Sequence, residues 1–412
     1  MIKIKKYNDR LVQITAIFYI LTLYFNMLIG VDNYRVAFLM WVRLIYLLLL
    51  FMYFFSTSSG VLPRKPVLII ALLLLHTVLF GLIFVNHTVT SLTFLHFREM
   101  MIYILMIALT CYFVWSQQLY EDYLHWSYWT AAVVLIRCGL THISHFVNPV
   151  LFVYILQSTH GYRTTFGFGH GNFTGNICVF TLIYSVMLLE SLRKGRPYKE
   201  LLKDRYVRVI LFTDLIIGEM LFSTQSRTSI LAGIVFVLAF SFFHWKELFH
   251  FSNRSRAFIT YSVTAILILF LTFFGNSVWA EANRADNFII NYPIFQRFSP
   301  FTGMGYIPPY GFLVDAYRLG TYALDIYYLY IFFTTGYIGS AIMLTFLVLT
   351  LVFSLQIKDP EKRGLSISLY LAMLIAGVGQ TSMVVYTLLP SMINWTILCL
   401  HMCPRPLDDI RI

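Results

Sequence analysis

Charged residues are scarce in this sequence of 412 residues. Only 12% of the residues are charged, whereas 59% are hydrophobic and the mean hydropathy is +0.73. A soluble domain has about a quarter of its residues charged and about half apolar. The composition therefore excludes an ordinary soluble domain. It predicts a polytopic membrane protein, because each spanning helix needs about 20 apolar residues.

Cysteines and clustered carboxylates are also few. The acids predicted outside the membrane, Asp286, Asp315 and Asp325, are scattered, and no carboxylate pair of the kind that holds a divalent ion with a nucleotide is present. The cysteines lie in or at the edge of apolar runs, with no disulfide or metal spacing: Cys111, Cys138, Cys178, Cys399 and Cys403. We therefore expect no metal and no other cofactor.

Lysine is absent from one side of the predicted topology. The net charge of +11 could suggest nucleic acid, but no basic patch lies in a soluble domain, so no nucleic-acid partner is expected. If the N-terminus is cytoplasmic, all ten lysines fall inside, three of them in the loop 191–206 together with three arginines. This bias predicts that both termini are cytoplasmic. The outer segments carry arginine alone: Arg35, Arg98, Arg163, Arg227, Arg284, Arg297 and Arg318.

Twelve apolar runs are long enough to span a bilayer. Backbone groups in lipid must be satisfied internally, and no barrel-like alternation is present, so we predict helices. The first run is too long for a signal peptide and no small-residue cleavage site follows it, so we expect a retained span. The predicted spans are 11–31, 36–55, 66–85, 99–116, 126–146, 171–190, 207–222, 228–243, 258–275, 326–353, 365–382 and 384–402.

Two predicted outer loops are long, about 147–170 and about 276–325. Loops beyond about 15 residues are usually functional or disordered, and the aromatic content of the second loop argues for order. We therefore predict one all-α polytopic membrane domain, residues 1–412, with about twelve transmembrane helices. The loop 276–325 is expected to form an external cap between helices nine and ten.

The stretch YRTTFGFGHGNFTGN, residues 162–176, is polar and rich in glycine although apolar runs flank it. It has only a superficial likeness to a phosphate-binding glycine loop, because no strand precedes it and no lysine follows it. Its glycines indicate tight backbone conformations and close approach of another group. Asn172 could cap the following helix. His170 could accept a proton or bond to a sugar, with a structural role as the alternative.

Arg163 and Arg227 lie on short polar stretches that abut predicted spans, at the depth of a lipid headgroup. A guanidinium presents a planar donor fork that suits phosphate, and lysine cannot copy it. The serines and threonines of STQSRTSIL, around Arg227, could cap the next helix and donate to phosphate oxygens. The alternative is that both arginines are interfacial cations at helix starts.

Three charged residues stand out inside the predicted spans: Arg137, Asp214 and Glu219. A charge at the bilayer centre costs about 2.5–3.5 kcal/mol on insertion scales, so such residues usually face a polar cavity or a partner. Arg137 could hold a lipid-borne phosphate, or it could pair with Asp214 or Glu219.

Four features in order along the chain carry a family resemblance: YRTTFGFGHGN, STQSRTSIL, the long outer loop and LDIYYLYIFFTTGYIG. Together they resemble the Wzy-type polysaccharide polymerases, which belong with the O-antigen ligases in a family of lipid-linked glycosyltransferases. Gly171 and Ile326 replace a proline and an asparagine of the family motifs. The matching positions are Arg163, Gly169, His170 and Asn172, then Ser226 and Arg227, then Asp325 and Tyr328.

The resemblance implies a reaction at the bacterial cytoplasmic membrane. A growing glycan on undecaprenyl diphosphate is the donor, and a lipid-linked repeat unit is the acceptor. The acceptor hydroxyl attacks the anomeric carbon and undecaprenyl diphosphate leaves, without metal or nucleotide. The implied partners are this lipid-linked oligosaccharide, membrane lipids, a flippase and a chain-length regulator. We assign catalytic roles to Arg163, His170, Arg227 and Asp325, and substrate binding to Arg137, Asn172, Arg297, Arg318 and Tyr328.

Two alternatives remain open. A ligase-type glycan transferase is less favoured, because the histidines that matter in the large loop of the ligases have no counterpart in 276–325. A lipid-linked oligosaccharide flippase belongs to a different class and would show related halves and broken helices at the membrane midplane.

Overall fold

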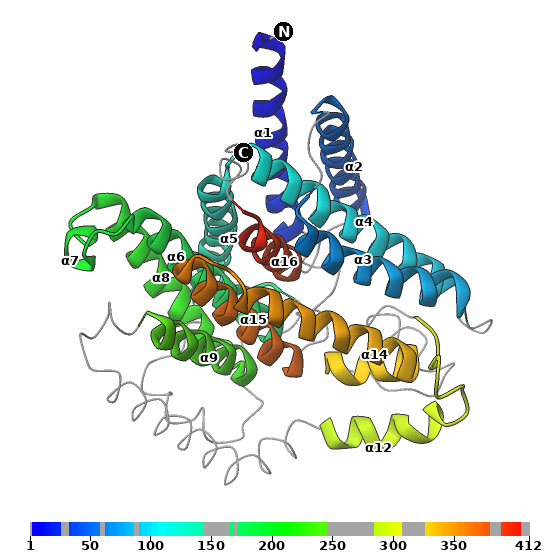
Figure 1. The fold of residues 1–412 in the computed structure, drawn as a ribbon. Helices are drawn as coiled ribbons and strands as arrows, with labels where there is room; N and C mark the ends of the chain where they lie inside the picture. Colours follow the sequence, from blue (N-terminus) through cyan, green and yellow to red (C-terminus); the bar gives the residue numbers. More distant parts are fainter. Residues whose placement is uncertain are drawn as a thin grey trace. The chain divides into compact units, whose positions relative to one another are not determined.

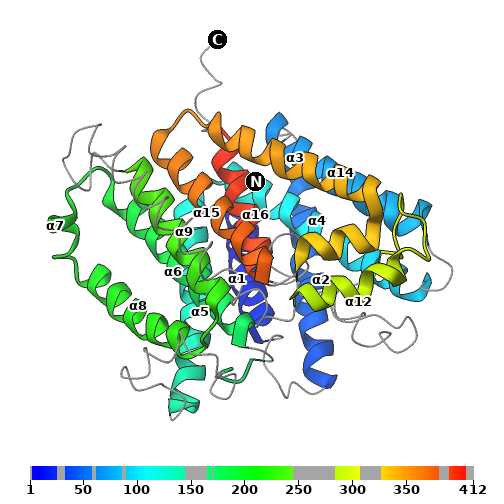
Figure 2. The same cartoon turned by 90° about the horizontal axis from the view of Figure 1, so that it is seen from below.

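The computed structural model of the chain describes residues 2–25, 33–57, 62–85, 90–143, 165–168, 171–244, 284–306, 326–379 and 389–404 (Figures 1 and 2). Throughout these ranges the regular structure is helical and contains no β-strand. The predicted all-α class is therefore confirmed for this part of the chain.

Each predicted span except 258–275 overlaps a helix, and 258–275 lies outside the described residues. The helices are α1 (Ile2–Phe25), α2 (Asn33–Ser56), α3 (Arg64–Val78) with the π-helical turn η1 (Leu79–Ile83), α4 (Thr90–Ser116), α5 (Tyr120–Thr141), α6 (Gly171–Arg193), α7 (Tyr198–Leu201), α8 (Arg205–Ser223), α9 (Arg227–Phe243), α12 (Arg284–Phe295), α14 (Tyr327–Leu355), α15 (Pro360–Gly379) and α16 (Leu389–Met402).

Four of the described helices are long and apolar enough to cross a membrane: Arg64–Ile83, Thr93–Ser116, Gly171–Arg193 and Tyr327–Leu355. Shorter apolar helices cover Arg10–Thr22, Trp41–Ser56 and Arg227–Phe243. These lengths and compositions are those of a membrane protein. The number of twelve spans stays a prediction.

Helix α2 illustrates a face suited to lipid. Trp41, Leu48 and Phe55 recur every seven residues and are 64%, 60% and 74% exposed. Tyr46 and Leu50, on the opposite face, are buried. A helix that is apolar on its outward face as well as its inward face fits a hydrocarbon environment rather than water.

The helices belong to two compact units. Unit 1 comprises Met1–Val67, Leu105–Gly233 and Thr387–Ile412. Within it α5, α6 and α8 pack against one another, and α1 packs beside α2 and α5 (Figure 1). The loop that contains the short helix α7 connects α6 to α8. The candidate functional site of unit 1 lies at one end of α6.

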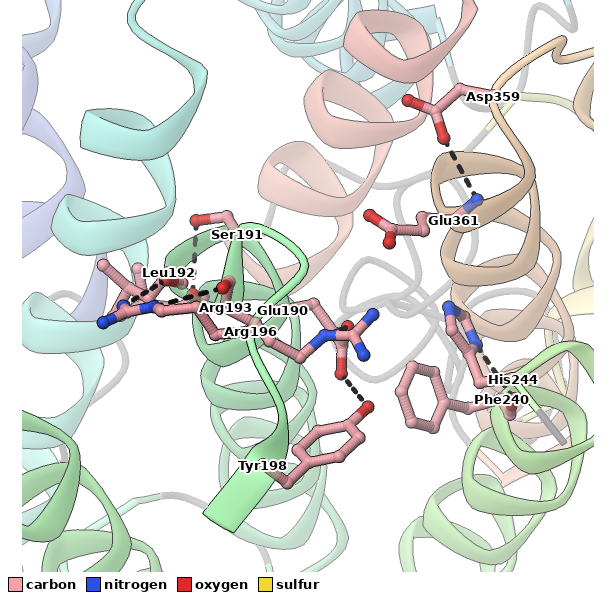
Figure 3. A network of polar contacts seen from close by, with 11 residues as sticks. Glu190, Ser191, Leu192, Arg193, Arg196, Tyr198, Phe240, His244, Asp359 and Glu361 are labelled. Carbon is pink, nitrogen blue, oxygen red and sulfur yellow. Dashed lines mark hydrogen bonds and ion pairs between the residues drawn. The ribbon is translucent and has the colours of Figure 1, made fainter. Parts of the chain in front are cut away.

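The opposite end of α6 carries a buried ion pair at the start of the basic loop 191–206 (Figure 3). Arg193 Nε lies 3.0 Å from Glu190 Oε2, and both side chains are buried. The Tyr198 hydroxyl donates to Glu190 Oε1 at 2.5 Å, and Arg193 Cζ lies 4.9 Å from the centre of the Tyr198 ring. These contacts fix the turn into α7, so most of the loop's cations are left on the surface.

Unit 2 comprises Leu68–Ile104 and Ile234–Tyr386. In it α14 packs beside α15 and α12 (Figure 2). Pro360 opens α15, and the Asp359 side chain accepts from Glu361 N at 3.1 Å, which caps this helix (Figure 3).

Helix α14 is broken at Gly336, where φ is 60° and ψ is −159°. The turn after α12 supplies the missing backbone partners. Met304 N donates to Phe333 O at 2.8 Å, and Tyr337 N donates to Pro300 O at 2.9 Å. A Cβ at position 336 would lie 2.5 Å from Pro300 O, so only glycine fits. Part of the predicted external cap is thus ordered against this break.

Candidate functional site

Two polar segments that lie 53 residues apart in the chain meet in unit 1. One is the first turn and a half of α6, and the other is the approach to α9. Ser229 Oγ donates to Asn176 Oδ1 at 2.8 Å and lies 2.6 Å from Ser226 Oγ. A Cβ at Gly175 would lie 2.5 Å from Ser226 Cβ. The absence of a side chain at Gly175 therefore allows the two helix N-termini to approach this closely.

The start of α9 places Arg227 at a helix N-terminus. Ser226 occupies the N-cap position, since its carbonyl accepts from Ile230 N at 3.0 Å, and Arg227 is the first residue of the helix. This agrees with the predicted cap, although the Ser226 hydroxyl bonds to Ser229 rather than to a backbone amide. A helix N-terminus carries unpaired N–H groups and partial positive charge. The half-buried Arg227 adds a full charge at the same place.

Residues 165–168 form a tight turn immediately before α6. Phe168 N donates to Thr165 O at 2.8 Å, and both central residues have positive φ, 47° for Phe166 and 83° for Gly167. Phe166 and Phe168 are completely buried. Thr174 Oγ1 donates to Thr165 O at 2.8 Å, which ties the turn to α6. The tight backbone predicted from the glycines is confirmed at Gly167.

The far side of this turn contacts the end of α5. His142 follows the last residue of α5, and its Cε1 atom would lie 3.2 Å from a Cβ at Gly167. His142 Nδ1 lies 3.0 Å from both Cys138 O and Thr141 Oγ1. The turn 165–168 and the start of α6 are therefore bounded by the end of α5 on one side and the start of α9 on the other. We call this set of elements the polar end of unit 1.

Sequence reasoning did not single out His142. A signal was nevertheless present, because His142 lies near the end of the predicted span 126–146, on the same predicted side as the stretch 162–176. A histidine without a motif gives no reason to choose it. Only the contact between His142 and Gly167 in the folded chain indicates that His142 belongs to the site.

The three in-span charges differ in their surroundings. Asp214 accepts from the Tyr128 hydroxyl at 3.0 Å and from Ser185 Oγ, which links α8 to α5 and α6. Arg137 is exposed on the last turns of α5, within five residues of His142, and Glu219 is half-buried on α8. The described contacts of Asp214 are thus with hydroxyl groups.

The residues predicted for the site divide into three groups. Arg137, Asn172 and Arg227 lie at the polar end of unit 1, with Asn172 half-buried as the second residue of α6 rather than ahead of the helix. Arg297, exposed after α12, and Tyr328 belong to unit 2, where the Tyr328 hydroxyl donates to Leu374 O at 2.7 Å. Outside the described residues lie Arg163, His170, Arg318 and Asp325.

Unit 2 contains a second buried polar cluster that the sequence did not indicate. The Tyr306 ring packs edge-on against His96 and His76, with ring centres 4.3 Å and 5.4 Å apart. Tyr330 Oη lies 3.2 Å from His96 Nε2. Burial raises the pKa of Tyr306 above its ordinary value, and a hydrogen bond with Thr77 acts in the opposite direction. The cluster holds the end of the described loop, residues 300–306, against α3 and α4.

Metal ligands do not gather in the described ranges: no three His, Cys, Asp or Glu side chains there are close enough to hold an ion. Neither a known protein-family model nor a curated protein sequence matches this chain. The functional argument therefore depends on the residues and their geometry.

Proposed function

We propose that the protein is a lipid-diphosphate-sugar-dependent glycosyltransferase that polymerises lipid-linked oligosaccharide repeat units at the outer face of a bacterial cytoplasmic membrane. The donor is a growing glycan on undecaprenyl diphosphate, and the acceptor is a single lipid-linked repeat unit. In this proposal both termini are cytoplasmic, and the polar end of unit 1 faces outward.

The observation that supports the proposal is the contact between the start of α6 and the start of α9, where Arg227 is the first residue. The family-like segments at 162–176 and 224–229 are remote in sequence, yet the start of α6 contacts the start of α9 through Gly175, Ser226 and Ser229. Two neighbouring helix N-termini, one of which begins with Arg227, form a favourable place for an anion. In this proposal the apolar helix bundle would hold that place at the depth of lipid headgroups.

This arrangement suits a diphosphate that leaves. Negative charge grows on the diphosphate oxygen as the anomeric bond breaks. A guanidinium that is already oriented stabilises the transition state more than the bound substrate. We assign that role to Arg227 and, in the undescribed part of the stretch, to Arg163. Arg137 and Asn172 are proposed to bind the lipid-linked substrate beside them.

The other assigned residues keep their proposed roles. Arg297 and Arg318, in the predicted external cap, and Tyr328, at the start of α14, would contact the glycan, and Asp325 would act near the acceptor. Because Tyr328 is half-exposed while its hydroxyl bonds to α15, its ring face rather than its hydroxyl is the part that a sugar would meet.

A flippase is the alternative from another class, and within the described ranges the break in α14 is an observation in its favour. That break is filled by residues 300–305 of the same unit, and it lies ten residues into a 29-residue helix. The two compact units are also assembled from interleaved pieces of the chain rather than from its two halves. Both points favour the transferase.

A deletion strain with its surface glycan sized by gel separates these functions. Loss of polymerisation would leave single repeat units on the surface. Loss of a flippase would remove the surface glycan altogether, and loss of a ligase would leave polymer on the lipid carrier. Complementation with the wild-type chain restores the ladder if the defect belongs to this protein.

A further inference from the structure

We propose that the turn from α7 into α8 binds the phosphate headgroups of anionic phospholipids in the adjacent membrane leaflet. Four exposed cations within residues 199–208 form this surface, which we call the basic corner: Lys199, Lys203, Arg205 and Arg208. The basic corner lies at the opposite end of α6 from the candidate functional site (Figure 1). Its role therefore goes beyond the proposed function and does not depend on it.

The cations that precede the basic corner in the chain are used within the protein. Lys194 Nζ lies 3.4 Å from Glu121 Oε2. Arg196 donates through Nη2 to Leu192 O at 2.9 Å and through Nε to Arg193 O at 3.3 Å (Figure 3). These carbonyl groups belong to the last residues of α6, where a helix leaves acceptors unsatisfied. Lys194 and Arg196 therefore have structural partners and are not assigned to a ligand.

The four cations of the basic corner differ from these. All four side chains are exposed, and within the described part of the chain none of them makes an ion pair or a side-chain hydrogen bond. Two acids, Glu200 and Asp204, lie among them, and Asp204 accepts from Tyr206 N at 2.9 Å to cap α8. The exposed surface therefore carries an excess of positive charge.

The exposed face of α8 shows which surroundings this charge meets. Arg205 and Arg208 share that face with Phe212 and Leu215, which follow at helical spacing and are 66% and 73% exposed. The helix packs against α5 and α6. Large apolar side chains on the outward face of such a helix fit hydrocarbon rather than water. The change from arginine to phenylalanine along one face therefore places both arginines where hydrocarbon gives way to headgroups.

Leu202 gives a second indication of a lipid surface. Its side chain is 51% exposed between the cations, whereas the neighbouring Leu201 is buried. Apolar side chains interspersed with cations are typical of segments that lie in the membrane interface, where the apolar groups insert below the phosphates. An acidic protein segment or a nucleic acid would engage the cations and leave Leu202 and Phe212 in water. A lipid leaflet accommodates both kinds of side chain.

The test places a fluorophore on a cysteine introduced at Leu202 in the purified full chain, reconstituted in phosphatidylcholine liposomes that contain a minor fraction of phosphatidylglycerol. The five native cysteines are buried. A nitroxide near the glycerol of one lipid or the other quenches the fluorophore when that lipid lies beside it. At equal mole fractions of labelled lipid, we expect phosphatidylglycerol to be enriched at Leu202 by about fivefold, the factor expected for one net cation near an anionic surface. High salt should reduce this preference.

Matched variants separate the basic corner from general surface charge. Arg208→Gln and Lys194→Gln each remove one exposed cation, but only the first belongs to the basic corner. We expect Arg208→Gln to lower the preference for phosphatidylglycerol and Lys194→Gln to retain it. Replacement of all four cations of the basic corner by glutamine should make quenching by the two lipids equal. A fluorophore at Leu215 should be quenched by nitroxides placed deep in the lipid chain, because that position meets hydrocarbon.

Three outcomes would overturn the lipid site. One is equal quenching by both lipids in the wild type, and if polyglutamate then changes the fluorescence at Leu202 in a salt-sensitive manner, the surface belongs to an acidic protein segment. Another is a loss of preference in Lys194→Gln as large as that in Arg208→Gln. The third is a fluorophore at Leu215 that no chain-labelled lipid quenches. Glycan transfer does not enter these measurements, so a failure of the proposed function would leave their results unchanged.

Discussion

Substitution of Gly175 by alanine tests whether the close approach of α6 and α9 holds the site together. The new Cβ would lie 2.5 Å from Ser226 Cβ and 2.9 Å from Ser229 Oγ, whereas ordinary contacts are 3.4 Å or longer. The start of α9 would therefore have to move by about 1 Å, and overpacking of this kind typically costs about 1–3 kcal/mol. Because a shift of about 1 Å at a reacting centre can cost about 10²-fold in rate, we expect polymerisation to fall further than stability.

The chain supplies a matched control for this change. A Cβ at Gly218, in α8, meets no atom within 4 Å. Gly218→Ala should therefore stabilise the helix by about 0.5–1 kcal/mol. Unfolding of both variants by denaturant in mixed micelles gives the two free energies, and sizing of the glycan product gives activity.

A double-mutant cycle identifies the clash itself. Ser226→Gly removes both Ser226 atoms that the new Cβ would meet, so Gly175→Ala should cost less in that background. The expected coupling is about 0.5–3 kcal/mol, in the range found for residues in contact. Equal free energies of unfolding for Gly175→Ala and Gly218→Ala, with no coupling to Ser226, would refute the packing argument.

Three further predictions follow from the topology, the chemistry and the packing. In intact cells, single cysteines introduced at Glu200 and Pro360 should be shielded from an impermeant thiol reagent, while those introduced at Thr165 and Ile290 should react. The five native cysteines are buried and give little background. Labelling at position 200 would overturn the predicted orientation. Because the outer acids are scattered and arginines are proposed to offset the diphosphate charge, a chelator should leave polymerisation in proteoliposomes unchanged. Polymerisation that is lost on chelation and restored by magnesium or manganese would contradict this prediction. Tyr128→Phe removes the 3.0 Å hydrogen bond to Asp214 and should lower the free energy of unfolding by about 0.5–2 kcal/mol. Tyr198→Phe, which removes a hydrogen bond at the opposite end of α6, serves for comparison. No change in stability of Tyr128→Phe would show that the hydrogen bond between α5 and α8 is dispensable.

The helices were predictable because a backbone in hydrocarbon cannot form hydrogen bonds with water and can adopt few structures. An apolar run must satisfy its own backbone groups, so runs of sufficient length become helices wherever they pack. The predicted starts at 171 and 228 nearly coincide with Gly171 and Arg227, where polar and glycine-rich stretches end the preceding loop. The break in α14 was not predicted, because a glycine within an apolar run is common and only its partners at 300–305 distinguish it.

The candidate site was predictable in its residue types and not in its contacts. Arg227 was chosen because a guanidinium beside a span suits a phosphate, and Asn172 was assigned to substrate binding because its position matches the family motif. Their adjacency depends on Gly175 facing Ser226, a packing relation between segments 53 residues apart that no local pattern encodes. His142, His76 and His96 were missed for the same reason, since each acquires its partners only in the folded chain.

The most direct test of the account compares the wild-type chain with Arg227→Lys in proteoliposomes supplied with lipid-diphosphate-linked repeat units. Lysine keeps the charge at the start of α9 but loses the donor fork, and removal of one preorganised donor typically costs about 10²–10³-fold in rate. The account predicts a ladder of glycan products from the wild type, and from Arg227→Lys single repeat units with normal expression and insertion. A wild-type chain that yields no polymer, or an Arg227→Lys variant with wild-type chain lengths, would contradict it.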